Sequence, residues 1–434
     1  MNAHDLILAP PSYLINVILI LLWFITPGLT VSTPGGNIRR GDCLARKWTP
    51  PQRLTADGRL ALDQDALRFS SGAARSTRVV LAGNQMPNLY DLRRGQGALS
   101  VYLDGEKLSS VPTGPFSFAH PKVALDAAGD VHLFWADLSD QRSRGNLVDW
   151  IAPQSENLWT ARYSQRAGWT NAERLMNQPV IWSKPFVDEI AAWGATLALT
   201  VVRMPGRDGT NGVTLLRYDG TRWVARDIAG TADAGASSVA IDRERIVVLF
   251  SAAGRSGRPR SNSLFALESR DGGNSWSLPF TLADEVGVSF ASPRLRLTAE
   301  HGLQAFWTQR ESTGGIAVHM RQLDQDLARP VTSQVFRIAG YVNLPQLVVD
   351  DCDRVHVVFE SYDPGSERGS MMHVWWDGAW SSVSPLLPSL RVLDAVALPD
   401  SGGGVRLYFL GQPQDAPARS DYNSYSSHWR PERP

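Results

Sequence analysis

The stretch Ser269-Arg270-Asp271-Gly272-Gly273-Asn274-Ser275-Trp276 decides the fold that the sequence predicts. It lies between two apolar runs and has the composition of a tight hairpin turn. Asp and Ser side chains bond to nearby backbone N–H groups in such turns, and glycine adopts backbone angles that other residues avoid. The closing Trp can anchor the turn against a sheet. The stretch therefore predicts a β-hairpin with four structural residues, Ser269, Asp271, Gly273 and Trp276.

A second pattern recurs along the whole chain. It consists of an apolar run, a polar turn and a second apolar run, and its clearest copies are residues 121–135, 293–307 and 345–359. Looser copies are residues 67–81, 185–202, 237–250 and 396–409. Each copy is typical of two strands joined by a tight turn. The copies recur roughly every 50 residues, a period that indicates a propeller or a solenoid.

A different hairpin follows most of these copies. Asp-Gly turns occur at residues 104–105, 219–220 and 377–378, and the stretch 269–276 takes the same place in another repeat. Asp-Gly between two strands is the strongest short signal for a hairpin. Each repeat therefore has four strands, here called A, B, C and D in chain order. The hairpin tryptophans occupy equivalent positions, which favours a structural role for Trp48, Trp169, Trp223, Trp276 and Trp380.

The two ends of the chain complete one another in this scheme. Seven A–B pairs are present, but the last has only residues 422–425 as a possible strand C and lacks a strand D. Residues 46–54 can supply that strand, which would close the ring without an open edge. The sequence predicts an all-β protein with a single closed β-propeller of four-stranded blades. Seven blades are preferred, and six remain the alternative because the copy at 67–81 is the weakest.

The pattern S-x-D-x-G-x-S-W at residues 269–276 resembles the Asp-box, or BNR repeat, of sialidase-like β-propellers. The resemblance implies the propeller architecture, with six blades in that family. The family also binds a sugar carboxylate with three arginines and has an Arg-Ile-Pro signature. Arg337-Ile338 is followed by Ala where that signature has Pro, and no Tyr–Glu pair can be assigned. The resemblance therefore extends to architecture and does not assign catalytic residues.

The N-terminal segment has a separate character. Residues 14–25 form a short apolar core that Pro27 and Gly28 end, which suits a signal peptide better than a membrane span. Residues 1–35 are therefore predicted to be a signal peptide or an uncleaved anchor, and residues 43–430 the propeller. This arrangement places the propeller outside the cytoplasm, secreted or in the periplasm or at the cell surface. Membrane attachment is expected only if the segment is uncleaved.

Cysteine content and charge narrow the possible partners. The chain has only two cysteines, Cys43 and Cys352, which can form a disulfide in an exported protein or remain as two thiols. No metal-ligand spacing or cofactor motif is present, so neither a metal nor a cofactor is expected. His132 and His356 occupy the same place in two repeats, which favours a structural role. The net charge of +0 gives no general attraction to nucleic acid.

The face of the ring formed by the D–A and B–C loops is the predicted ligand surface. Its B–C loops are rich in arginine, which is suited to bidentate capture of anionic groups. The predicted ligand contacts follow strand B or precede strand A: Arg203, Arg310, Arg391, Trp182, Tyr341 and His120. Glu360 is the candidate general base if the protein is an enzyme, because it ends a B strand close to Tyr362.

Three functions agree with these features. The first is a propeller that binds an anionic or polar glycan, or a protein partner, without catalysis. The second is a sialidase-like glycoside hydrolase or another glycan-active enzyme, which would need two carboxylates in contrasting environments. The third is a structural propeller that assembles with partner proteins.

Overall fold

The computed structural model describes the chain in segments that cover most of the predicted propeller. The described residues are 46–48, 50–53, 60–70, 77–86, 98–103, 106–111, 118–137, 157–176, 178–181, 190–204, 211–253, 261–286, 289–298, 302–310, 316–323, 327, 330–338, 341–350, 352, 354–362, 369–388, 390–400, 404–413 and 423–431. All regular structure in these segments is β-strand. Accordingly, this part of the chain contains no helix with the length and apolarity that a membrane crossing requires. The predicted N-terminal segment, residues 1–35, lies outside the described residues.

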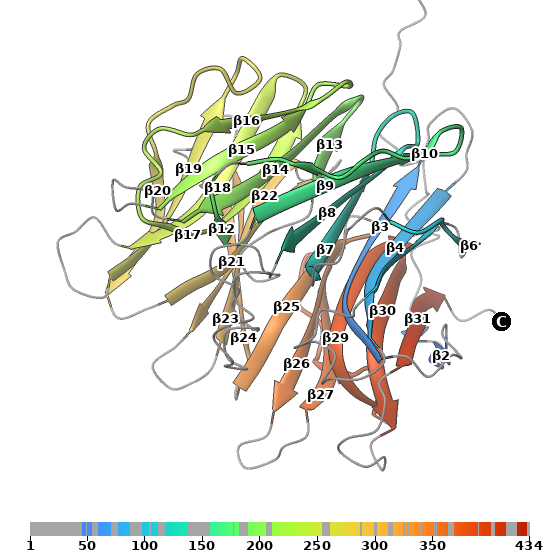
Figure 1. Cartoon of the computed structure of the whole chain (residues 1–434). Helices are drawn as coiled ribbons and strands as arrows, with labels where there is room; N and C mark the ends of the chain where they lie inside the picture. Colours follow the sequence, from blue (N-terminus) through green and yellow to red (C-terminus); the bar gives the residue numbers. More distant parts are fainter. Residues whose placement is uncertain are drawn as a thin grey trace, which may run out of the picture.

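The strands form antiparallel sheets in chain order, and each sheet is a propeller blade (Figure 1). Blade 1 has β3 (Leu60–Ser70), β4 (Thr77–Met86), β5 (Ala98–Leu103) and β6 (Glu106–Lys107). Blade 2 has β7 (Phe118–Leu125), β8 (Val131–Asp137), β9 (Asn157–Ser164), β10 (Gly168–Trp169) and β11 (Glu173–Arg174). Blade 3 has β12 (Val180–Ile181), β13 (Ala191–Trp193), β14 (Thr196–Arg203), β15 (Gly212–Tyr218) and β16 (Trp223–Asp227).

The other blades follow the same order. Blade 4 has β17 (Ala234–Asp242), β18 (Arg245–Ala253), β19 (Ser261–Ser269) and β20 (Phe280–Val286). Blade 5 has β21 (Ser289–Thr298), β22 (Gly302–Arg310), β23 (Ile316–Leu323) and β24 (Pro330–Ile338). Blade 6 has β25 (Tyr341–Val349), β26 (Val355–Tyr362), β27 (Gly369–Trp376) and β28 (Ser384–Pro385). Blade 7 has β29 (Leu390–Asp400), β30 (Gly404–Pro413) and β31 (Asn423–Pro431), together with β1 (Arg46–Trp48) and β2 (Gln52–Arg53).

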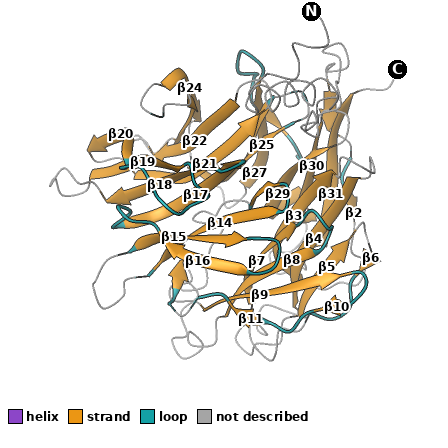
Figure 2. Ribbon diagram, turned by 90° about the horizontal axis from the view of Figure 1, so that it is seen from above, coloured by secondary structure: helices purple, strands orange, loops and turns teal. Residues whose placement is uncertain are grey.

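The strand pairing among the described residues gives seven sheets, each with four strand positions. Blades 2, 3 and 7 have five strands because one position is divided into two short strands that pair with the same neighbour. First strands of successive blades pack together, as β3 does on β7 and β17 on β21, and β29 packs on β3 to complete the ring. Figure 2 shows these first strands toward the middle of the molecule. The predicted all-β closed propeller is confirmed, and of the two blade counts that the sequence leaves open, the pairing gives seven.

The N-terminal strands close the last blade as predicted. β1 pairs with β31 through Arg46↔Pro431 to Trp48↔Trp429, and β2 pairs with the same strand through Gln52↔Ser426. The fourth strand of blade 7 therefore comes from the opposite end of the chain. This pairing covers the edge that β31 would otherwise expose.

A break in register marks the start of most first strands. In blades 2, 5 and 6 the shifts lie at Ala119/Lys122, Ala291/Arg294 and Asn343/Gln346. Each of these intervals contains a proline, which lacks an N–H for the ladder and is therefore found at bulges. Blades 1, 4 and 7 have a similar shift without proline. The prolines that begin the clearest sequence repeats therefore mark bulges in the innermost strands.

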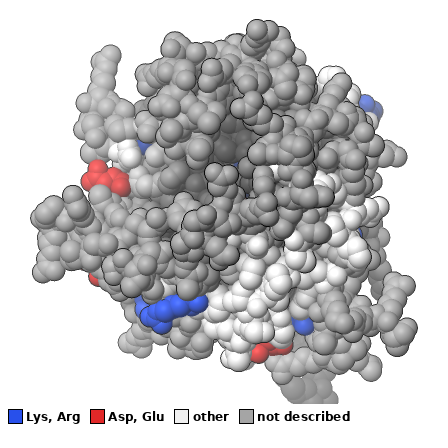
Figure 3. All heavy atoms as spheres, turned by 90° about the horizontal axis from the view of Figure 1, so that it is seen from below, with Lys and Arg blue, Asp and Glu red and all other residues white. Residues whose placement is uncertain are grey.

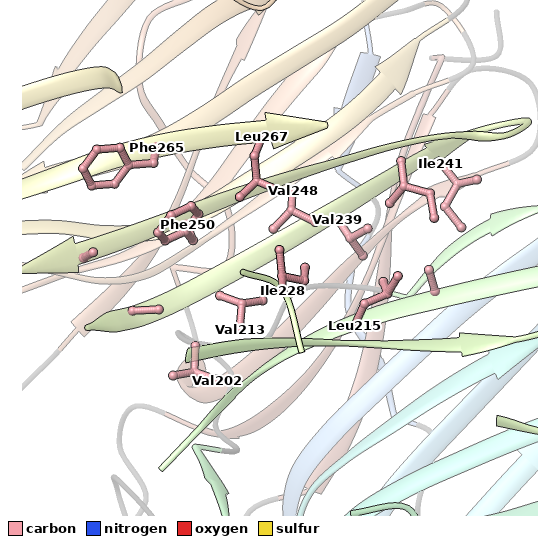
Figure 4. Packing of buried hydrophobic residues seen from close by; sticks show 14 residues of the cluster. Val202, Val213, Leu215, Ile228, Val239, Ile241, Val248, Phe250, Phe265 and Leu267 are labelled. Carbon is pink, nitrogen blue, oxygen red and sulfur yellow. The ribbon is translucent and has the colours of Figure 1, made fainter. Parts of the chain in front are cut away.

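The hydrophobic core lies between the blades. A buried cluster between blades 3 and 4 brings Val202 and Val213 against Val239, Val248 and Phe250 (Figure 4). Comparable clusters lie between blades 1 and 2 and between blades 4 and 5. Because both faces of each sheet are covered by its neighbours, strands such as β14 and β18 are apolar along nearly their whole length.

Hairpin tryptophans fasten blades 2, 3, 4 and 6 to the blades that precede them. Trp169 of blade 2 donates through Nε1 to Ser109 O, next to blade 1, at 2.9 Å. Trp223 of blade 3 packs edge-on against Phe134 of blade 2, with ring centroids 5.0 Å apart. Trp276 joins the cluster between blades 3 and 4, and Trp380 of blade 6 lies 5.2 Å from Phe336 of blade 5. These tryptophans therefore join neighbouring sheets, where the sequence indicated only an anchor within one sheet.

Candidate functional site

The Asp-box-like stretch forms the turn between β19 and β20, and its carboxylate is engaged by the turn itself. Asp271 Oδ1 accepts hydrogen bonds from Asn274 N at 3.0 Å and Ser275 N at 2.9 Å, and Oδ2 accepts one from Ser275 Oγ at 2.6 Å. Ser269 Oγ accepts from Gly273 N at 2.7 Å. The hydroxyl and N–H of Ser275 hold the pKa of Asp271 well below its ordinary value. The carboxylate therefore serves to fix the turn.

Alanine substitutions at Gly273 and Gly220 are expected to separate the cost of a steric clash from the cost of backbone strain. Gly273 has φ of +90°, and an added Cβ would lie 2.8 Å from Leu215 Cδ2 in the buried core of blade 3. Gly220 has a similar φ of +95° but open space around it. We expect Gly220→Ala to cost about 1–2 kcal/mol through strain alone, and Gly273→Ala to cost about 1–3 kcal/mol more. Urea unfolding midpoints measure the difference, and equal losses would contradict the assigned packing.

The predicted ligand contacts lie at one edge of the inner strands. Arg203 and Arg310 end β14 and β22, where they pair with Val180 and Ser289 at the starts of the neighbouring first strands. Tyr341 begins β25 and pairs with Tyr362, Arg391 pairs with Gln412, and His120 lies within the register shift of β7. The topology therefore brings these backbone positions to the same edge of their blades. Trp182 lies outside the described residues.

Arg203 is directed across its blade toward the outer strand. Its Nε lies 3.2 Å from Asp227 Oδ1 of β16, and its guanidinium covers Gly212 of the intervening strand. Asp227 also accepts a hydrogen bond from Thr214 Oγ1 at 2.6 Å. A ligand at the ring's centre would have to compete with this ion pair for the Arg203 guanidinium.

Glu360 is buried near the end of β26, with 8% of its surface exposed, and pairs in register with Asn343. A buried carboxylate in this position is compatible with the role of general base that the sequence suggests. Glu360 therefore stays a prediction.

A pocket lies between blades 2 and 3. It is a cavity of about 160 Å³ at the edge of the ring opposite the predicted ligand face. One wall is formed by β8, β9 and the residues before and within β11, and the other by the hairpin between β15 and β16. The lining residues are His132, Thr160, Ala161, Arg162, Thr170, Asn171, Glu173, Tyr218, Thr221, Arg222 and Trp223.

The inner end of the pocket is fixed by a buried chain of hydrogen bonds. His132 Nε2 lies 3.1 Å from Asp126 Oδ2, and Trp223 Nε1 donates to His132 Nδ1 at 3.3 Å. Because Nδ1 accepts, the proton of His132 lies on Nε2 and is directed at Asp126. Burial raises the pKa of Asp126, but bonds from His132 and from the Asp130 N–H outweigh burial and lower it overall. These residues hold the Trp223 ring in place.

Arg162 extends along the floor of the pocket. Its Nη1 donates to Tyr218 Oη at 2.7 Å, and Tyr218 Oη donates in turn to Gly220 O at 3.0 Å. Its Nε lies 3.8 Å from Asp130 Oδ2. Burial raises the pKa of Tyr218, so its hydroxyl stays protonated and can donate. The Arg162 side chain is 39% exposed, so part of the positioned guanidinium faces solvent.

The junction of blades 6 and 7 explains why this pocket is open. Asp350 and His356 occupy the same turn positions as Asp126 and His132, and their side chains lie 3.2 Å apart. His373 of β27 is the residue equivalent to Thr160 of β9. Thr160 pairs with Phe134, two residues after His132, and His373 pairs with Val358, two residues after His356. The His373 imidazole lies 3.0 Å from His356 and accepts a hydrogen bond from Trp48 Nε1 at 3.3 Å. An imidazole therefore fills the space that Thr160 leaves open in blade 2.

The sequence did not identify this pocket. It indicated the turn 218–223 as a hairpin and His132 as structural, and both roles agree with the contacts above. The signal that could have found it is the residue at position 160. Thr160 lies beside the Asp126–His132 turn, whereas the equivalent residue beside the Asp350–His356 turn is His373. No group of three or more His, Cys, Asp or Glu side chains in the described segments is arranged to hold a metal ion.

One face of the described surface carries dispersed charge. On the face in Figure 3, the visible Lys and Arg atoms and the visible Asp and Glu atoms occur in small separate groups. Cys352 is disulfide-bonded, and the only other cysteine of the chain, Cys43, lies outside the described residues. The pairing of these two cysteines stays a prediction.

Comparisons with known proteins find only solved structures of low similarity. No family model and no curated protein matches the sequence. Similar solved structures include a protein of unknown function from Dyadobacter fermentans, with 14% identity over 74% of this chain and 97% of that chain, at a TM-score of 0.48. A second is an α-L-arabinofuranosidase from Fusarium graminearum, with 12% identity over 72% of this chain and 93% of that chain, at a TM-score of 0.47. A third is the endosialidase of phage phi92, with 10% identity over 89% of this chain and 69% of that chain, at a TM-score of 0.45. These TM-scores are too low to indicate a ligand or an activity for this chain.

Proposed function

We propose that the protein is a carbohydrate-binding propeller and that the pocket between blades 2 and 3 is its recognition site. The observation behind the proposal is the combination of aromatic rings with positioned hydrogen-bonding groups in one open pocket. Trp223 and Tyr218 supply apolar surface, and Arg162 and Glu173 supply a donor and an acceptor. Sugars present both apolar C–H faces and hydroxyl groups, so they suit a mixed lining of this kind.

The size of the pocket suits one small ring. Pockets that enclose drug-sized ligands measure ~300–1,000 Å³, and this pocket measures about 160 Å³. A single terminal sugar residue would fit, with the remainder of a glycan extending into solvent past Thr170 and Asn171, which are exposed. The proposal therefore favours recognition of chain ends or side branches.

An extracytoplasmic location is part of the proposal. Disulfides persist in oxidising compartments and are rare in the cytosol. Cys352 is disulfide-bonded, which supports export of the propeller as the apolar N-terminal segment suggests. Glycans are abundant ligands for a protein in that location.

Filling the pocket is the direct test of this function. Thr160→His introduces the side chain that closes the equivalent space in blade 6, and we expect it to abolish binding on a glycan array. Thr160→Val is the matched control, because it keeps the cavity open. Thermal unfolding shows whether each variant is folded. Arg162→Ala is a second variant that alters a partly exposed side chain, and we expect at least tenfold weaker binding.

The outcomes separate three possibilities. Loss of binding in Thr160→His with binding retained in Thr160→Val supports the proposed site. Unchanged binding in both Thr160→His and Arg162→Ala would contradict it and leave the opposite face, with Arg310 and Arg391, as the ligand surface. Hydrolysis of the bound glycan that disappears in Glu360→Gln would instead establish the protein as a glycoside hydrolase.

A further inference from the structure

We propose that the pocket between blades 2 and 3 selects a neutral sugar residue and discriminates against sugar acids. This inference rests on the proposed function and specifies its ligand class. It chooses between the two ligand classes that the sequence left open, an anionic or a polar glycan, and excludes the anionic one, which depended on arginines at the opposite face. The argument concerns the balance of charge in the pocket and the placement of donors and acceptors.

The positive groups of the pocket have acidic neighbours. Arg162 Nε lies 3.8 Å from Asp130 Oδ2, and Arg222 Nε lies 4.0 Å from Asp219 Oδ2. Hydrogen bonds from Thr221 and from the Arg222 N–H lower the pKa of Asp219 to about 2, so that carboxylate is ionised at neutral pH. Each arginine therefore has its own counter-charge before any ligand arrives.

Glu173 adds a further negative charge within the lining. It pairs in register with Thr160, directly opposite the residue that opens the pocket. Asp126 lies behind His132 at the inner end, and its lowered pKa keeps it ionised at neutral pH. The carboxylate of a sugar acid would therefore meet Glu173, while Asp130 and Asp219 offset part of the positive charge of the two arginines. Like charges a few ångströms apart repel, which opposes binding of an acid.

Hydroxyl groups suit the same arrangement. Glu173 accepts hydrogen bonds, whereas Arg162 donates them. Glu173 of β11 pairs with Thr160 of β9, and Arg162 lies two residues further along β9. Two neighbouring hydroxyls of a sugar ring can donate to the carboxylate and accept from the guanidinium at the same time. The Thr221 and Asn171 side chains extend this mixed lining. A neutral sugar with adjacent hydroxyls therefore satisfies the pocket without adding charge.

The test compares sugars that differ only in a carboxylate. Methyl glycosides of galactose and glucose are titrated calorimetrically into the wild-type protein, alongside the corresponding galacturonate and glucuronate, at pH 7. We expect at least one neutral sugar to bind about tenfold or more tightly than its acid. Glu173→Gln removes the charged acceptor, and we expect it to weaken the neutral sugar about tenfold or more, since a charge-assisted hydrogen bond is lost.

The response of the acids distinguishes this inference from the proposed function. Glu244→Gln is the charge-matched control, because Glu244 is exposed on the turn between β17 and β18 of blade 4 and does not line the pocket. If a uronate binds more tightly than its neutral counterpart, the neutral-sugar inference is wrong and carbohydrate binding stands. Tighter uronate binding in Glu173→Gln, but not in Glu244→Gln, supports the repulsion assigned to Glu173. If none of these sugars binds and no glycan on the array binds, both proposals are wrong.

Discussion

Deletion of residues 36–56 is expected to lower the thermal unfolding midpoint by roughly 10 °C or more. The deletion removes β1 and β2 and leaves β31 as an exposed edge of blade 7. It also removes Trp48, whose ring lies edge-on to His373 of blade 6 at 5.4 Å and donates a hydrogen bond to it. Loss of a packed Trp costs ~3–5 kcal/mol. Differential scanning calorimetry of the wild-type and deletion proteins measures the effect.

Two point variants divide this effect between its causes. Trp48→Ala keeps both strands and tests the contact with blade 6, whereas Cys352→Ser keeps that contact and tests the predicted disulfide with Cys43. A disulfide contributes ~2–5 kcal/mol in many exported proteins. Each variant should lower the midpoint by less than the deletion does. An unchanged midpoint after deletion would show that the N-terminal strands do not close the ring.

Asp350→Asn is expected to destabilise the protein by about 3–5 kcal/mol, because it leaves a buried cation without its partner. Asp350 is fully buried and accepts from Arg354 Nη2 at 2.7 Å and from Arg354 Nε at 3.0 Å. Arg354 is 3% exposed, and its guanidinium lies 4.9 Å from the centre of the Trp429 ring. Guanidinium chloride unfolding gives the change in the free energy of unfolding.

Asp126→Asn is the matched control within the same chain. Asp126 has the same place in the turn of blade 2 and also contacts a histidine, but Asp130 stands where blade 6 has Arg354. Since the described partners of Asp126 include no buried arginine, we expect a clearly smaller loss of stability. Equal losses in the two variants would contradict the role assigned to the Asp350–Arg354 pair.

The effect of Asp350→Asn should also depend on pH. Burial raises the pKa of Asp350, but bonds and charges from His356 and Arg354 outweigh burial and lower it to about 2. A lowered carboxyl pKa stabilises the folded state above the ordinary value of 3.8, and this contribution disappears as pH falls toward 2. The difference between wild type and variant should therefore be constant near neutral pH and narrow below about pH 4. A difference that widened on acidification would have the wrong sign.

The sequence predicted the architecture because its signals are local. A strand, a tight turn and a second strand lie within about fifteen residues, and prolines such as Pro121 and Pro293 mark bulges at equivalent places. The closing strand was also predictable, because an incomplete last repeat required a partner from the other end. These features depend on turn chemistry and on strand pairing, which a single sequence displays directly.

The site was less predictable because it depends on contacts between blades. Arg203 was placed at the end of its strand, but its pairing with Asp227 across the sheet could not be seen from sequence. The pocket exists because position 160 is Thr where position 373 is His, and that equivalence requires the register of both sheets. The hairpin Trp residues were assigned to turns, and their contacts with the preceding blades emerged only from the three-dimensional arrangement.

The most direct test of the proposed carbohydrate site is a crystal structure of the protein with its best-binding monosaccharide. The account predicts electron density for one sugar ring between Arg162 and Trp223, with hydroxyls within hydrogen-bonding distance of Arg162 and Glu173. A sugar bound at the opposite face, near Arg310 or Arg391, with the pocket between blades 2 and 3 free of sugar, would contradict it.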